Sequence, residues 1–192
     1  MLIDQIPLLK KAVIDLPPAE KDKLLLKLIS KDPILVFQLE YKLLEDERDL
    51  DNRVDNVKIE IDKKISWIDK YLSQERNYSP GYFMMDVREM SGLVNEHVLI
   101  TKHKISEVEL RVYILEGIIN CSANILFLKR TRHSEKLLAY FAGRVKNVLE
   151  KYVKLHEDLQ FDFRDRINMV LDYANKTAIK EYLEALQLPN EV

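Results

Sequence analysis

Apolar residues along much of this chain recur with the spacing of an α-helix. The clearest stripe lies between positions 50 and 72, where its steps of three or four residues average close to the helical repeat of about 3.6. The stripe consists of Leu50, Val54, Val57, Ile61, Ile65, Ile68 and Leu72. Further helical patterns follow over about 82–102, 105–130, 134–156 and 160–187. The chain is therefore predicted to be all-α, with a bundle of about four helices after the stripe.

Prolines divide the first part of the chain into short helices. Pro17 and Pro18 separate an apolar segment over 2–14 from a second one over 19–29. Proline is tolerated at the first helical position because its missing N–H would have no intrahelical partner there. We therefore predict a short N-terminal helix pair within residues 1–31 that packs on the rest.

A longer helix is predicted next. Asp32 followed by Pro33 is typical of a capped helix start, and no helix breaker follows until after residue 74. The pattern thus predicts one long helix over about 33–74, roughly 60 Å long at about 1.5 Å per residue. The charged run 45–51 is the expected place for a bend. This helix and the later ones would form one unit over 32–192.

The first 40 or so residues resemble the helix pairs of HEAT-like α-solenoids. The residues that carry the resemblance are Leu16-Pro17-Pro18, Leu24-Leu25-Leu26, Leu28 and Asp32-Pro33. They cover about a fifth of the chain, and no period of about 30–50 residues repeats afterwards. The resemblance therefore implies a helix pair, not a repeat protein.

One segment also fits a β-strand. Val108, Leu110, Val112 and Ile114 alternate with other residues, as on a half-buried strand. We favour a helix because the helical stripe continues for several turns beyond this segment and the chain offers no second strand to pair with it.

Composition and charge narrow the class of protein. The chain has 30 Lys and Arg against 32 Asp and Glu, a net charge of −2, which argues against nucleic-acid binding. Cys121 is the only cysteine, so an intrachain disulfide and a Cys-rich zinc site are excluded. No signal peptide and no membrane span are evident, which predicts a cytoplasmic protein without a membrane partner.

The charged and metal-ligating residues do not form a recognisable metal site. Acidic residues gather over 45–55, where carboxylates could hold Mg²⁺ through water, but Arg48 and Arg53 interrupt them, as on a solvated helix face. His97 and His103 are six residues apart and do not share a helical face. We expect no metal and no other cofactor.

The long stripe suggests association. A 192-residue globule cannot easily cover such a helix, so we expect a homodimer or a protein partner bound through the 50–72 stripe. Asp49, Arg53, Glu60 and Lys64 would lie at the rim of that interface.

Polar residues inside two predicted helices suggest a ligand site. Asn95 and His97 on one helix, and Asn120 and Asn124 on the next, could line a pocket between antiparallel neighbours. The alternative, which we favour, is a buried hydrogen-bonded network that sets the helix register. Three of the four glycines, Gly92, Gly117 and Gly143, also fall inside predicted helices, where a close helix crossing is the ordinary explanation.

The best basic cluster lies between two predicted helices. It consists of Lys129, Arg130, Arg132 and His133. Cations at a helix C-terminus complement its dipole, and the other interpretation is an anion contact. A second basic patch over 102–104 would lie at the far end of the 105–130 helix, so the two patches could not hold one small ligand.

No sequence motif indicates a particular enzymatic reaction. The long helix with its apolar stripe favours a non-enzymatic helical interaction or scaffold module. One alternative is a small-molecule or nucleotide enzyme with a site at the inter-helical polar residues. Another is a nucleic-acid-associated factor that uses the basic loops. The interaction module needs only features that are present, whereas the alternatives need residues assembled from distant positions.

Overall fold

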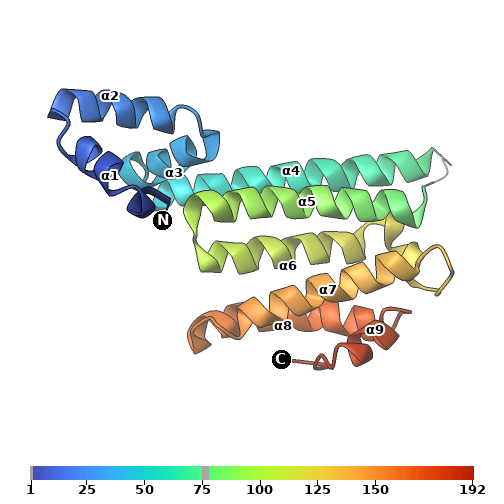
Figure 1. Cartoon of the computed structure of the whole chain (residues 1–192). Coiled ribbons are helices and arrows are strands. Elements are labelled where there is room, and N and C mark those ends of the chain that lie inside the picture. Colours follow the sequence, from blue (N-terminus) through green and yellow to red (C-terminus); the bar gives the residue numbers. More distant parts are fainter. Residues whose placement is uncertain (1, 75–77) are drawn as a thin grey trace. The chain divides into compact units, whose positions relative to one another are not determined.

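The computed structural model describes residues 2–74 and 78–192, and every regular element in these ranges is helical (Figure 1). In chain order, with η marking a 3-10 helix, the elements are η1 (Leu2–Gln5), α1 (Pro7–Ile14), α2 (Pro18–Ile29), α3 (Pro33–Leu44), α4 (Glu47–Ser73), α5 (Pro80–Thr101), α6 (Lys104–Asn120), η2 (Ser122–Phe127), α7 (Glu135–Tyr152), α8 (Glu157–Asn175) and α9 (Lys180–Ala185). The all-α prediction is confirmed. None of the described helices is long and apolar enough to cross a membrane.

The chain divides after Glu45 into two compact units. The first contains α1, α2 and α3, and each of these helices has a proline in its first turn. Asp32 caps α3 as predicted, because its Oδ1 accepts hydrogen bonds from the backbone N–H groups of Ile34 and Leu35 at 3.0 and 3.2 Å. The packing of residues 1–31 on the rest stays a prediction.

The predicted long helix is present, but its predicted bounds of 33–74 are wrong. α3 ends at Leu44 and α4 begins at Glu47, so α3 belongs to the first unit and α4 to the second. The break falls inside the charged run 45–51, where a bend was expected.

Two acids of that run end one helix and begin the next. Asp46 Oδ1 accepts hydrogen bonds from the N–H groups of Arg48 and Asp49 at 2.8 and 3.3 Å, and Asp49 Oδ2 accepts from the Asp46 N–H at 3.1 Å. This reciprocal capping box satisfies N–H groups that a helix start leaves without partners. The acidic run therefore has a structural role at the start of α4.

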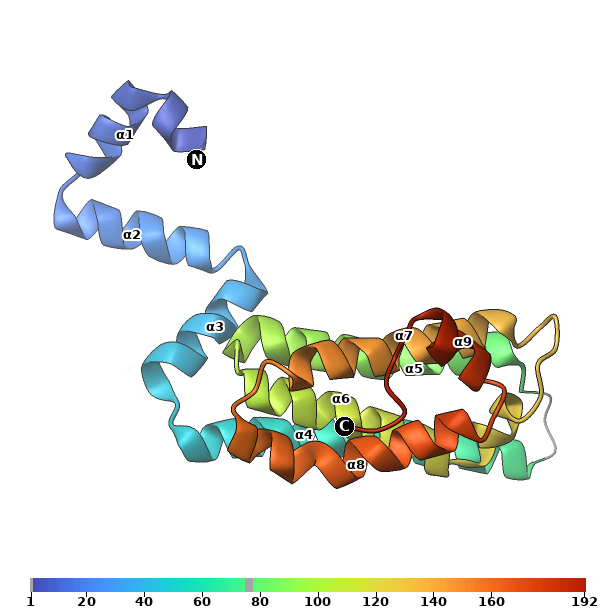
Figure 2. The same ribbon diagram turned by 90° about the horizontal axis from the view of Figure 1, so that it is seen from below.

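The second unit is a bundle with α6 at its centre. α4, α5 and α6 follow one another in the sequence and pack side by side (Figures 1 and 2). α6 also contacts α7 and α8, so neighbours surround it on several sides. Val108, Leu110, Val112 and Ile114 are consequently all buried. A helix that is buried on more than one face needs apolar residues on each of those faces, beyond a single stripe. The strand-like alternation of these four residues therefore arises on a helix.

One of the three helical glycines marks a close helix crossing. A Cβ atom at Gly117 of α6 would lie 2.2 Å from Ile65 Cδ1 of α4, so the missing side chain lets these helices approach. At Gly92 of α5 and Gly143 of α7 a Cβ atom would meet nothing within 4 Å. Close helix packing therefore explains Gly117 but not Gly92 or Gly143.

Two of the predicted helices end earlier than the pattern indicated. The 105–130 helix stops at Asn120, where Cys121 is extended and η2 follows. Asp69 Oδ1 of α4 accepts a hydrogen bond from the Ser122 N–H at 2.7 Å and so holds this break. The 160–187 helix is divided into α8 and α9, and the Ala178 N–H in between donates to the Phe127 carbonyl at 3.0 Å. Both interruptions depend on contacts with distant segments.

The start of α7 also differs in detail. Ser134 occupies the residue before the helix, as predicted, but its side chain makes no capping hydrogen bond to α7. Its Oγ instead accepts from the Thr131 N–H at 2.9 Å and so organises the preceding loop.

Candidate functional site

The apolar stripe that was predicted to be an interface is packed inside the bundle. Val54, Ile61 and Ile68 are buried, and Val57, Ile65 and Leu72 lie partly buried against the same core, with Leu50 half-buried at the end. α5 and α6 of the same chain pack against α4. Of the predicted rim, Lys64 pairs with Asp86 and Glu89 of α5. The stripe is therefore core within one chain and does not present a surface to a partner.

The four polar residues predicted to line one pocket are not brought together. Asn95 and His97 lie near the end of α5, close to the turn into α6, whereas Asn120 ends α6 and Asn124 lies in η2. Because α5 and α6 are consecutive and packed together, the two pairs lie at opposite ends of this helical hairpin. A single pocket lined by all four is not formed, and ligand binding at either pair stays a prediction.

His97 belongs to a buried network at the α5–α6 turn. Its Nε2 lies 2.8 Å from Ser106 Oγ, and His103 Nδ1 lies 3.1 Å from the same oxygen. Thr101 Oγ1 donates to the His97 carbonyl at 2.9 Å. Ser106 is almost fully buried, so its hydroxyl is not accessible to a substrate. These contacts support the interpretation that the network sets the register of the two helices.

Lowering the pH should destabilise the fold through His97. Burial, with smaller contributions from His103 and Arg53, lowers the pKa of His97, so its imidazole stays neutral where an unfolded histidine, with a pKa of about 6.5, takes up a proton. Stability is therefore complete above about pH 6.5 and falls as the pH decreases from there through the lower folded pKa. Urea unfolding at about pH 7.5 and about pH 5.5 measures this loss.

His97→Gln should flatten that pH dependence, while His133→Gln, at an exposed position, should leave it intact. An equal pH dependence in the unmodified chain and in both variants would contradict the assignment to His97.

The second pair of polar residues, Asn120 and Asn124, donates hydrogen bonds to backbone carbonyls at the end of α6. Asn120 Nδ2 donates to the Glu116 carbonyl at 2.9 Å, and Asn124 Nδ2 donates to the Ile119 carbonyl at 2.8 Å. Cys121 between them is buried, and burial raises the pKa of its thiol to about 11. The thiol is therefore protonated at neutral pH and does not supply a nucleophile.

The predicted basic cluster lies on the exposed segment between η2 and α7. Arg130 is already paired, with Nη2 3.0 Å from Glu135 Oε1 and Nη1 2.8 Å from Glu181 Oε2 of α9. Lys129, Arg132 and His133 are exposed and form no ion pair with any other described residue. Arg130 thus ties α7 to α9, and anion binding by the other three stays a prediction.

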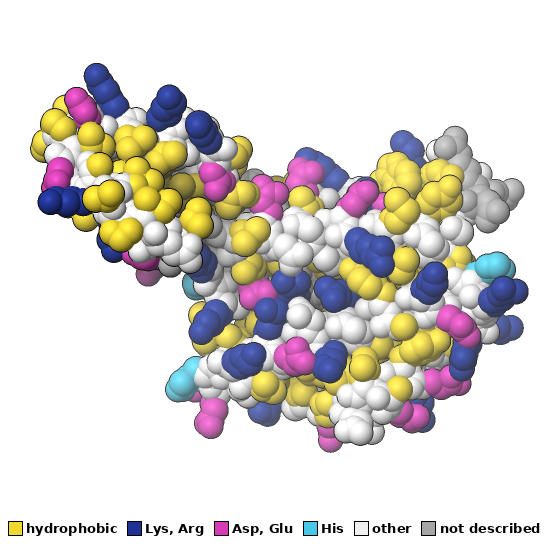
Figure 3. Space-filling view, in the orientation of Figure 1, with side chains coloured by type: hydrophobic (Ala, Val, Ile, Leu, Met, Phe, Trp, Pro, Cys, Tyr) yellow, Lys and Arg dark blue, Asp and Glu magenta, His cyan; other side chains and the backbone are white. Residues whose placement is uncertain are grey.

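The first unit has an unusually apolar surface. No described residue of η1, α1, α2 or α3 is buried, and Figure 3 shows hydrophobic side chains across this unit. Fourteen large hydrophobic side chains are exposed there, against eleven in the described part of the much larger bundle. The fourteen are Leu2, Ile3, Ile6, Leu8, Leu9, Ile14, Leu24, Leu25, Leu26, Leu28, Val36, Phe37, Leu43 and Leu44. This surface was not predicted.

The sequence did contain a signal for it. Leu24, Leu25 and Leu26 are consecutive, and residues one apart point about 100° apart around a helix, so a single buried face cannot cover all of them. A helix with apolar side chains on several sides cannot bury all of them against a single neighbouring helix.

A charged cluster between α5, α6 and α7 was also missed. Glu107 of α6 is buried, and its Oε1 lies 2.8 Å from Arg111 Nη2 and 2.7 Å from Lys151 Nζ of α7. Arg111 Nη2 also donates to Asn95 Oδ1 of α5 at 2.9 Å. Burial opposes the ionisation of Glu107, but the hydrogen bonds from Lys151 and Arg111 outweigh it and lower the pKa of this carboxyl.

Comparison with known proteins does not assign this chain to a family. No protein-family model matches the chain, and neither the curated proteins nor the solved structures give a significant match. Among the residues that the structure describes, no group of three or more His, Cys, Asp or Glu is placed to hold a metal ion. The surfaces of the molecule are therefore the remaining indication of its function.

Proposed function

We propose that this chain is a helical interaction module whose first unit associates with the first unit of a second copy. The observation that carries the proposal is the absence of any buried residue from η1 to α3, although this segment is rich in leucine and isoleucine. Folded monomers rarely leave large contiguous apolar patches in water, and such patches usually mark interaction surfaces.

The apolar area is large enough for a stable interface. Fourteen mostly exposed aliphatic and aromatic side chains offer an area on the order of 1,000 Å², compared with about 800 Å² per partner in a typical interface. At roughly 25 cal/mol per Å², covering part of this area offsets the entropy lost on association. Apolar contact is thus the expected driving force.

The charge of the unit favours a second copy as the partner. Residues 1–45 contain seven Lys and seven Asp or Glu, with no Arg, so their formal net charge is zero. A nucleic acid or an anionic membrane surface would be recognised by an excess of positive charge, which this unit does not have. Two neutral, apolar copies meet without electrostatic repulsion and need no complementary partner.

Light scattering on the unmodified chain should show reversible association over micromolar concentrations, and the association should persist at high salt because apolar contacts are not screened. A variant with Leu8, Leu25 and Leu44 replaced by Asp should be monomeric. These side chains are 84%, 57% and 81% exposed, so the change should not disturb a core.

The matched control replaces three exposed apolar residues of the bundle, Leu128, Val153 and Phe161, by Asp. This control should associate like the unmodified chain. If the unmodified chain is monomeric at every concentration, or if both triple variants lose association equally, pairing of the first units is excluded.

A further inference from the structure

Two arginines on neighbouring helices of the bundle have no carboxylate partner among the residues that the structure describes. The guanidinium carbons of Arg88 on α5 and Arg144 on α7 lie 5.2 and 5.0 Å from the centre of the Tyr140 ring. Neither arginine forms an ion pair with another described residue. Stacking on an aromatic ring uses the face of a guanidinium group and leaves its in-plane N–H donors available.

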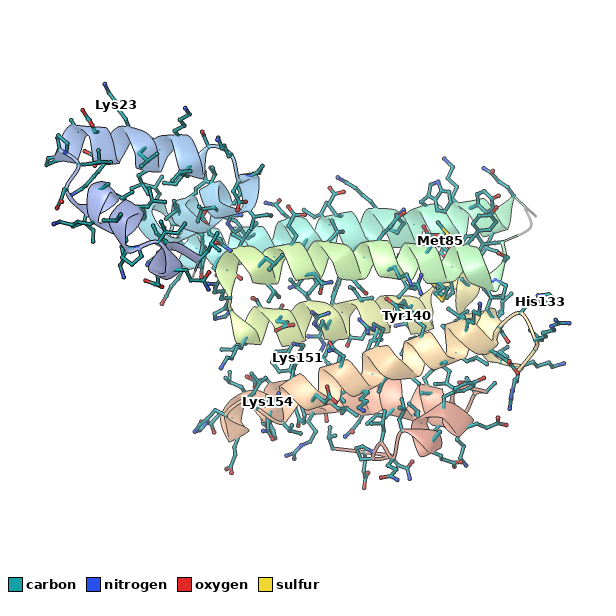
Figure 4. All side chains as sticks on the ribbon, viewed as in Figure 1. Lys23, Met85, His133, Tyr140, Lys151 and Lys154 are labelled. Carbon is teal, nitrogen blue, oxygen red and sulfur yellow. The ribbon has the colours of Figure 1, made fainter. Side chains whose placement is uncertain are left out.

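The adjoining charged cluster is positive as well. Within the described ranges, Arg111 and Lys151 share one carboxylate, that of Glu107, so only one of their two charges is neutralised. Arg111 and Arg144 line the same small cavity between α5, α6 and α7, which connects the two groups of cations. Tyr140 and Lys151 are labelled along α7 in Figure 4, and Figure 3 shows several Lys and Arg side chains on this side of the bundle.

The floor of this cavity contains polar atoms without partners. Arg144 Nε and Asn147 Oδ1 are buried, and within the described part of the chain neither has a hydrogen-bond partner. Ser91 lines the same space. The enclosed volume is about 10 Å³, which accommodates about one water molecule but no larger group. The terminal N–H groups of Arg144 form no hydrogen bond with another described residue, so they remain for a ligand outside this cavity.

Two glycines leave space beside these cations. Gly92 lies one helical turn after Arg88 on α5, and Gly143 directly precedes Arg144 on α7. A Cβ atom at either position would meet nothing within 4 Å, so helix packing does not account for them. Glycine destabilises the interior of a helix, so its presence at both positions calls for another reason. A ligand that approaches the backbone requires open space of this kind next to the cations.

We propose that this surface, the α5–α7 groove, binds the phosphate group of a small soluble molecule. Ser91, Arg111, Arg144 and Asn147 of the groove line the cavity. Arg88 adjoins them through the Tyr140 ring that it shares with Arg144, and Lys151 adjoins them through Glu107. The fork of guanidinium donors matches the geometry of phosphate oxygens, and four cations against one carboxylate suit one or two phosphate groups. The chain as a whole has a net charge of −2, which does not attract a long polyanion such as a nucleic acid.

Calorimetric titration of the full chain with pyrophosphate, at constant ionic strength, tests this proposal. Saturable binding is expected, and Arg144→Gln should weaken it by about tenfold or more because it removes charge-assisted hydrogen bonds. Arg88→Gln, at an exposed position that does not contribute to the core, should weaken it similarly and guards against loss of folding. The matched control is Lys146→Gln, a half-exposed cation of α7 that pairs with Glu150 outside the groove. This substitution should leave the affinity unchanged.

A second measurement distinguishes a soluble phosphate from a lipid headgroup, which share the same chemistry. Vesicles containing phosphatidic acid should bind the chain no better than vesicles of neutral lipid. Binding to the acidic vesicles without binding to pyrophosphate would overturn the proposal of a soluble ligand. The absence of saturable pyrophosphate binding up to about 10 mM, or an equal loss in the Lys146 and arginine variants, would also overturn it.

Discussion

Replacing Ile61 by Asp should cost the bundle about 4 kcal/mol or more of its free energy of unfolding. Ile61 is fully buried in α4, with α5 and α6 packed against that helix, and no lysine or arginine is among the buried residues of the described part of the chain. An unpaired charge in an apolar core is among the most costly single changes. Urea unfolding followed by circular dichroism measures the loss.

Ile59→Asp is the matched control. Ile59 lies two residues earlier on the same helix and is 48% exposed, so its replacement should change the free energy of unfolding by less than about 1 kcal/mol. Similar effects of the two substitutions would contradict the assignment of the 50–72 stripe to the core.

Glu107→Gln should cost about 2–3 kcal/mol at neutral pH. The change leaves the charges of Arg111 and Lys151 in a mostly buried position without the carboxylate that compensates them. Glu150→Gln removes a carboxylate from an exposed pair with Lys146 on α7 and should cost less than about 0.5 kcal/mol.

The pH dependence of the Glu107 variant provides a separate check. Because the pKa of Glu107 is lowered in the fold, its contribution is complete above the ordinary glutamate pKa of about 4.3 and is lost as the pH falls through the lower folded value. The difference between Glu107→Gln and the unmodified chain should therefore shrink in strong acid. A difference that stays constant down to about pH 2 would show that charge is not its cause.

Helix positions could be predicted wherever local pattern decides them. The 50–72 stripe predicts α4, because Ile61 and Ile68 repeat on one face and that face is buried. Asp32 and Pro33 predict the start of α3, because a cap acts within its own first turn. The helix at 108–114 was correctly preferred over a strand.

Features that depend on distant segments could not be predicted. The end of α6 is set by Asp69, which is 53 residues from its hydrogen-bond partner Ser122. The stripe was expected to be covered by the later helices or by a second copy of the chain, and periodicity alone could not decide between them because it does not place α5 and α6 on α4. The larger set of exposed apolar side chains lies instead in the first unit.

The candidate sites likewise could not be predicted where they depend on contacts between distant segments. Asn95 and Asn120 were grouped because both interrupt apolar helices, but their separation along antiparallel helices places them far apart. Arg88, Arg111 and Arg144 carry no local signal, since single arginines on helices usually face solvent. Only the packing of α5, α6 and α7 brings them together.

The central position of α6 also affects the order in which the chain can complete its core during synthesis. Val112 and Leu115 of α6 share a small apolar space with Val145 and Val148 of α7 and with Ile167 and Val170 of α8. When the ribosome has released α4, α5 and α6, that side of α6 is not fully covered until Val170 of α8, 50 residues after Asn120, has emerged. A nascent bundle therefore exposes a continuous aliphatic face, the kind of surface that holding chaperones recognise and that drives aggregation.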